Sequence, residues 1–103
     1  MKEATQVNVS HEGKVYACRV RPLNPSALGY PRHGVTFALH NDDRVYTVEV
    51  THGLPVSSWI VCHAWYIDDA GTKRVVNEQR AFRKHALLSA IARIALDTTK
   101  ARA

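Results

Sequence analysis

Apolar and polar residues alternate through successive short segments of this chain, and a helical spacing replaces the alternation only after Val76. An alternation with a period of two is typical of strands that bury one face. Most segments are separated by short polar turns, which favour antiparallel pairing because a parallel crossover needs about a dozen connecting residues or more. We therefore predict five or six antiparallel strands, in the segments 7–10, 14–21, 35–40, 44–51, 59–67 and 72–76.

A single helix is predicted from Asn77 to about Thr98. Asn77 is a suitable N-cap, because its side chain can accept hydrogen bonds from the free amides of a first helical turn. The expected fold class is α+β, an antiparallel sheet of five to six strands packed by one long C-terminal helix, with residues 1–103 forming a single domain. The apolar stripe that faces the sheet is predicted to contain Leu87, Leu88, Ile91, Ile94 and Ala95.

Two segments have distinctive patterns. Three prolines and two glycines interrupt 22–34, and because proline cannot donate to a central ladder, this segment is predicted to be a long loop. It would be either an exposed connection or a functional loop. Segment 59–67 is apolar on both faces, which predicts a central, well-buried strand. Strict alternation would place one set on a common face: Trp59, Val61, Trp65 and Ile67.

The composition is that of an ordinary globular protein, with 46% hydrophobic and 22% charged residues. Segment 1–12 does not have the pattern of an export signal, and no apolar run approaches the roughly 20 residues of a membrane span. We expect a cytoplasmic location and no membrane contact. Cys18 and Cys62 lack the spacing of a zinc or redox motif, so both are expected to be buried free thiols; a disulfide would require export.

The charge of the chain is unevenly distributed. The net charge of +5 is the sum of +3 over residues 1–34, −4 over 35–69 and +6 over 70–103. Such asymmetry bears on association with partners rather than on fold.

The start of the predicted helix carries a basic cluster, although cations there oppose the helix dipole. This placement favours an anion site for phosphates or for an acidic protein surface, and the alternative is a set of solvated side chains. Arg19, Arg21 and Arg32 would extend the site if the first hairpin and the proline-rich segment lie nearby. The cluster contains Lys73, Arg74, Arg80, Arg83, Lys84 and His85.

A second contact surface is predicted on the outer side of the helix. Phe82, Ala86 and Leu96 project away from the apolar stripe, beside Arg93, Ser89 and Lys100. They would contact a protein partner or form a homodimer, or they are single exposed apolar residues of the kind that most surfaces carry. The predicted partner-binding or anion-binding residues are therefore Lys73, Arg74, Arg80, Arg83, Lys84, Arg93, Phe82 and Arg32.

The sequence shows no catalytic or metal signature. None of the histidines has zinc-site spacing, and no glycine-rich phosphate loop or nucleophile elbow is present. No metal and no cofactor are expected. Aromatic residues of the strands, and Tyr30 of the predicted loop, could stack on bases of a single-stranded nucleic acid, although most are expected in the core. The strand aromatics are Trp59, Trp65, Tyr66, Tyr16 and Tyr46.

Three functions remain open from the sequence. The leading hypothesis is a small non-enzymatic binding protein, such as an inhibitor or adaptor of the kind that phages and mobile elements encode. It would recognise a host protein or a nucleic-acid-handling complex through the basic helix, and the acidic middle third, which repels polyanions, favours it. The alternatives are a nucleic-acid-binding module that contacts phosphates through 73–85, and a small enzyme that acts on an anionic substrate with His85 as acid or base.

Overall fold

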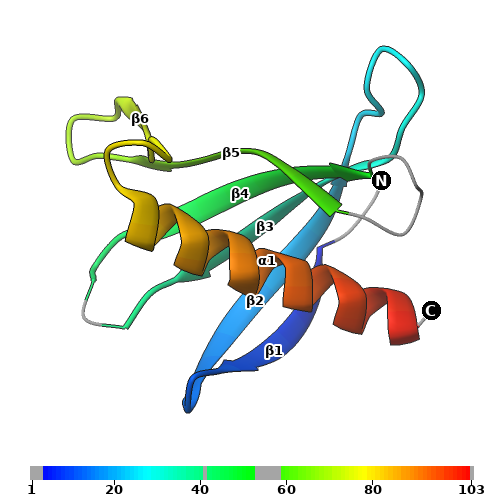
Figure 1. Cartoon of the computed structure of the whole chain (residues 1–103), viewed down its shortest axis with the longest axis horizontal. Coiled ribbons are helices and arrows are strands. Elements are labelled where there is room, and N and C mark those ends of the chain that lie inside the picture. Colours follow the sequence, from blue (N-terminus) through cyan, green and yellow to red (C-terminus); the bar gives the residue numbers. More distant parts are fainter. Residues whose placement is uncertain (1–3, 41, 53–58, 103) are drawn as a thin grey trace.

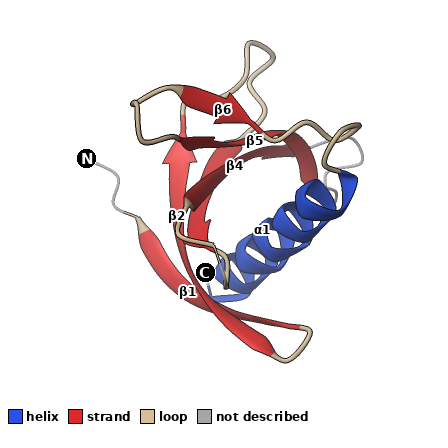
Figure 2. Cartoon of the chain, turned by 90° about the vertical axis from the view of Figure 1, so that its left-hand side faces the viewer, coloured by secondary structure: helices blue, strands red, loops and turns tan. Residues whose placement is uncertain are grey.

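The computed structural model describes residues 4–40, 42–52 and 59–102 (Figure 1). Within these residues one antiparallel sheet has the strand order β1-β2-β3-β4-β5-β6, and the helix α1 crosses one of its faces (Figure 2). The predicted α+β fold, with five to six strands and one C-terminal helix, is confirmed. The elements are β1 (Thr5–His11), β2 (Lys14–Leu23), β3 (Arg32–Ala38), β4 (Val45–His52), β5 (Trp59–Ile67), β6 (Lys73–Val75) and α1 (Phe82–Arg102).

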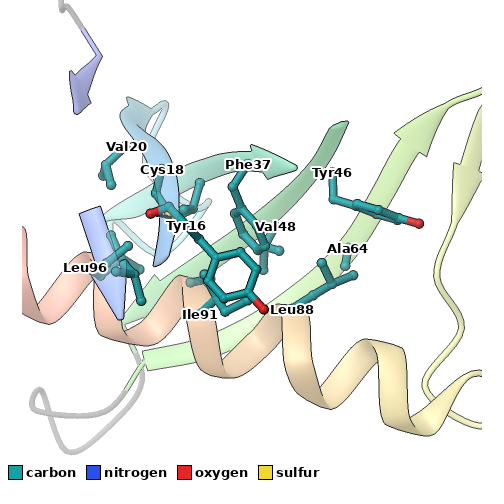
Figure 3. Close-up of a cluster of buried hydrophobic side chains, with 14 of the residues drawn as sticks. Tyr16, Cys18, Val20, Phe37, Tyr46, Val48, Ala64, Leu88, Ile91 and Leu96 are labelled. Atoms are coloured by element: carbon teal, nitrogen blue, oxygen red, sulfur yellow. Dashed lines mark hydrogen bonds between the residues drawn. The ribbon is translucent and has the colours of Figure 1, made fainter. Parts of the chain in front are cut away.

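Each strand pairs with its neighbour in sequence, so the registers line up one set of alternate residues on the face below α1. Val35 of β3, for example, lies opposite Val20 of β2 and Val48 of β4. The strands contribute their buried set to a cluster with the buried stripe of α1 (Figure 3). The stripe comprises Leu88, Ile91, Ala92, Ala95 and Leu96, and the strand residues include Val7, Val9, Tyr16, Cys18, Val20, Val35, Phe37, Tyr46, Val48, Val50 and Ala64.

The buried stripe of α1 differs from the predicted one. Leu96 was expected on the outer surface, yet its side chain is only 3% exposed and joins the same cluster as Val20 of β2 (Figure 3). The twisted sheet curls around the helix, and both β1 and β2 contact α1 (Figure 2). Phe82, in contrast, is 65% exposed, as expected. The predicted outer surface is therefore wrong for Leu96 and for Ser89, which is also buried.

The connection between β2 and β3 is shorter than predicted. Pro22 lies opposite His33, and Leu23 lies opposite Arg32, so the two strands extend into the segment that was expected to be a loop. Only 24–31 remains outside the strands. β1 begins opposite Val20, and among the described residues no strand pairs with that edge of β2 at Pro22, where the missing N–H is therefore tolerated.

β5 is neither central nor well buried, and its side chains do not alternate strictly. Glu49 of β4 lies opposite His63, but the next residue, Val50, lies opposite Val61, so Cys62 is an extra residue in a β-bulge. Because the bulge reverses the alternation, Trp59 and Val61 pack on the core together with Ala64 and Tyr66. The prediction that they share a face with Trp65 and Ile67 was wrong.

The two thiols lie in different environments. Both cysteines are free, but only Cys18 is buried, and burial raises its pKa to about 11. Cys62 is exposed, which contradicts the expectation that both thiols are buried.

The helix begins one turn later than predicted. The Asn77 Oδ1 atom accepts hydrogen bonds from the backbone N–H groups of Gln79 and Arg80, at 2.8 and 3.2 Å, so Asn77 caps the turn that precedes α1. In the described part of the chain, no helix has both the length and the apolar character needed to cross a membrane. Parts of the predicted turns, at Asn41 and 53–55, lie outside the described residues.

Alanine substitutions at Leu96 and Phe82 distinguish the observed helix orientation from the predicted one. Leu96→Ala should lower the free energy of unfolding by about 2 to 5 kcal/mol, because it leaves a cavity in the core. Phe82→Ala should change it by about 0.5 kcal/mol or less, since the ring is mostly in solvent. Urea unfolding followed by circular dichroism measures both values, and similar losses for the two variants would contradict the orientation.

Candidate functional site on the open face of the sheet

The face of the sheet opposite α1 is not covered by any described helix or strand (Figure 2). We call it the open face. The strand registers place its side chains in rows that cross the sheet. One row runs through Arg19, Thr36, Thr47 and Trp65, and the next through Arg21, Gly34, Glu49 and His63.

A hollow of about 370 Å³ lies where these two rows cross the middle strands. Gly34 creates part of this space, because it contributes no side chain between Arg21 and Glu49. A Cβ atom at Gly34 would lie 3.6 Å from Leu23 Cδ1, in ordinary contact, so the sheet itself does not require glycine at this position. This central hollow is lined by Ala4, Arg19, Arg21, Leu23, Gly34, Thr36, Thr47, Glu49 and Trp65.

Glu49 organises one wall of the central hollow. Its side chain is only 16% exposed. Its Oε1 atom accepts a hydrogen bond from Arg32 Nη2 at 3.1 Å, and its Oε2 atom accepts one from the Trp65 indole N–H at 3.2 Å. His63 Nε2 also contacts Oε2. The carboxylate therefore fixes the position of three side chains from β3 and β5, while Arg32 compensates its negative charge.

Arg19 and Arg21 give the central hollow its positive charge. Both side chains are exposed, and among the described residues neither has an acidic partner. They lie two residues apart on β2 and therefore point to the same side of the sheet. Lys73 of β6 adds a further cation to this face, with its Nζ atom 4.5 Å from the centre of the Trp65 ring.

The opposite end of the open face is acidic. A wider depression of about 940 Å³ lies there, and Trp65 and Thr47 line both it and the central hollow. Asp43 and Asp69 contribute exposed carboxylates to its rim, and Arg44 is a cation in the same lining. The negative charge of the open face is therefore concentrated near these turns, whereas Arg19 and Arg21 lie on β2.

The structure divides the basic cluster predicted at the helix start. Arg74 donates to Asp68 over 2.8 Å, and Lys84 donates to the Tyr46 hydroxyl over 3.2 Å, so both are engaged within the fold. Lys73 and Arg32 lie on the open face together with Arg19 and Arg21. Those still exposed on the helix side are Arg80, Arg83, Arg93 and Phe82.

Sequence reasoning did not identify Gly34, Glu49, Thr36 or Thr47. Their positions on the polar side of alternating strands were visible, since Thr36 lies between the buried Val35 and Phe37. The alternation does not specify the strand register, which brings these residues of β3 and β4 together.

Comparisons with protein-family models, with curated proteins and with solved structures found no match for the chain. Within the described ranges, no group of three or more histidine, cysteine, aspartate or glutamate side chains is arranged to hold a metal ion. The chemistry of the open face is therefore inferred from its own residues.

The contacts of Asp42 predict how stability depends on pH. A hydrogen bond from Tyr46 is the main cause that lowers the pKa of the Asp42 carboxyl group, and Arg44 N–H and Lys84 add to it. Because the pKa is lower in the folded state, this stabilisation is present above about pH 4 and is lost as the pH falls through the folded-state pKa. Asp42→Asn should therefore be less stable than the wild type at neutral pH and should lose less stability on acidification.

Urea unfolding at a series of pH values tests this expectation, with the exposed neighbour Asp43→Asn as the matched control. The control should follow the wild-type pH profile. An unchanged profile in Asp42→Asn would show that the contacts with Tyr46 and Lys84 do not contribute to stability.

Proposed function

We propose that the protein is a non-enzymatic binding module that holds single-stranded nucleic acid on the open face of its sheet. The observation that carries the proposal is the central hollow, in which Arg19 and Arg21 lack acidic partners among the described residues and Trp65 supplies an aromatic ring. Cationic side chains and an aromatic platform on one surface are the combination by which proteins bind single strands without strict sequence preference.

The phosphates would be bound along β2. Arg19 and Arg21 lie in line on this strand, and each guanidinium can form charge-assisted hydrogen bonds with phosphate oxygens. Arg32 lies on the same face one strand away, but its bond to Glu49 assigns it to holding the wall of the hollow. The acidic rim at Asp43 and Asp69 supports a path for the backbone on the β2 side.

The base would be bound at Trp65. In the free protein Lys73 lies over this ring, so a base that stacks there replaces the ammonium group, which then becomes available to a phosphate. Thr36 and Thr47 offer hydroxyl groups to the base edge from the floor of the hollow. A base can enter only when it is unpaired and unstacked, which favours single strands over duplexes.

Recognition of an acidic protein through the helix start stays a prediction. Arg80, Arg83 and Phe82 are exposed and could contribute to it, whereas Arg74 and Lys84 are engaged with residues of the fold. Arg19 and Arg21 lie on the open face, and Arg80 and Arg83 lie at the helix start. The same change of charge can therefore be made on each of the two surfaces.

The decisive comparison is between Arg19→Glu/Arg21→Glu and Arg80→Glu/Arg83→Glu. Wild-type protein should bind a fluorescent mixed-sequence oligonucleotide at low salt, with an affinity that falls linearly on logarithmic scales as salt increases. The open-face variant should bind at least about tenfold more weakly, and loss of two phosphate contacts should reduce the salt slope by about 1.4. The helix variant should keep the wild-type slope. Fluorescence anisotropy measures these values.

Two results would contradict the proposal. Absence of binding at low salt by the wild type would exclude nucleic acid as the ligand. A larger loss in the helix variant than in the open-face variant would instead support phosphate contacts at the helix start.

The two tryptophans allow a separate test of stacking. Trp65 lines the central hollow, whereas Trp59 packs on the core and donates its indole N–H to Asp97 on the helix side of the sheet. A stacked base should quench the intrinsic fluorescence of Trp65. The quenching should persist in Trp59→Phe and disappear in Trp65→Phe, and the reverse pattern would place the base elsewhere.

A further inference from the structure

A groove lies between β5 and α1, on the side of the molecule away from β1. It has a volume of about 360 Å³, and we call it the β5–α1 groove. Ile60 and Val61 form the strand wall, and successive turns of the helix form the other. The helix wall and its approach comprise Glu78, Phe82, His85, Ala86, Ser89, Ala90 and Arg93.

Beside this groove, the outer edge of β5 is paired with another strand over only part of its length. β6 pairs only with residues 65–67 of β5, as its position at one end of that strand shows (Figure 1), and the Val76 N–H donates to the Ala64 carbonyl over 2.8 Å. Among the described residues, no strand continues this pairing toward Ile60. The backbone groups of an open sheet edge can pair with another chain.

The groove also exposes apolar side chains. Phe82 on the helix wall is 65% exposed. Ile60 is 50% exposed, but it lies opposite Thr51 and between the core-facing Trp59 and Val61, so its side chain points to the open face. The small residues Ala86, Ser89 and Ala90 lie between Phe82 and Arg93 on the helix wall and allow close approach of another surface. Contact with a protein surface would remove this apolar area from water.

The charges of the groove are opposite at its two ends. Glu78 lies before the first turn of α1, and Arg93 lies about 17 Å along the helix from Phe82. Both side chains are exposed, and neither has an ionic partner among the described residues. A surface with a negative end and a positive end is complementary to a copy of itself turned through 180°, because a two-fold interface contacts the same residues on both subunits.

We propose that a second copy of this chain occupies the β5–α1 groove and forms a two-fold symmetric homodimer. Phe82 of each copy packs on Ala90 of the other, on either side of an axis near Ala86, and Glu78 of each copy pairs with Arg93 of the other. The interface lies apart from the open face, so the dimer does not depend on nucleic-acid binding.

Sedimentation velocity over a range of protein concentrations tests the proposal. Measurements use a Cys62→Ser background, because Cys62 is exposed beside the groove and could form an intermolecular disulfide. The protein should form dimers that dissociate on dilution. Arg93→Glu and Glu78→Arg should each raise the dissociation constant at least about tenfold, since each places like charges opposite one another. The double variant Glu78→Arg/Arg93→Glu should restore it.

Arg83→Glu is the matched control, because it makes the same change of charge on α1 outside the β5–α1 groove. It should leave the dissociation constant within about threefold of the wild-type value. Circular dichroism verifies that each variant is folded. A protein that stays monomeric at all concentrations, a double variant that fails to dimerise, or equal weakening by Arg83→Glu would overturn the proposal.

Discussion

The packing of α1 against a strongly curled sheet is the interaction on which the other features of this protein depend. Ala92 and Ala95 are fully buried between the larger Leu88, Ile91 and Leu96, so the helix axis can approach the strands closely. Because the sheet wraps around the helix, five of its six strands contact α1 (Figure 2). The core therefore uses one side of nearly every strand and leaves the other side to solvent.

This division determines where charge can lie. A strand that buries Cys18 and Val20 must present Arg19 and Arg21 on the other face, since successive side chains alternate. The same rule brings Glu49 to the open face between the buried Val48 and Val50. Burial on one side thus gathers the polar residues of separate strands on a common surface, and their pairing with one another follows from the registers.

The basic residues at the helix start dominate the charge pattern of the sequence, but in the folded protein they have different environments. Lys84 reaches Tyr46 and Asp42 of the neighbouring turn and strand, and Arg74 is held by Asp68 of its own hairpin. Lys84 and Arg74 were predicted to bind a partner, but these contacts engage them within the fold. Arg19 and Arg21, in contrast, have no acidic partners in the described part of the chain. The candidate binding surface moves from the helix to the sheet for this reason.

The sequence by itself determined the α+β class, the antiparallel hairpins and the faces of β2, because these follow from local periodicity and turn residues. It did not determine the rotation of α1 about its own axis relative to the sheet. Leu96 was predicted on the outer surface, but the curvature of the sheet decides which helical side chains are buried. The bulge at Cys62 likewise depends on how β5 pairs with β4, and it reversed the faces of Trp59 and Val61. The central hollow and the β5–α1 groove exist only through contacts between segments distant in sequence, which only the tertiary structure specifies.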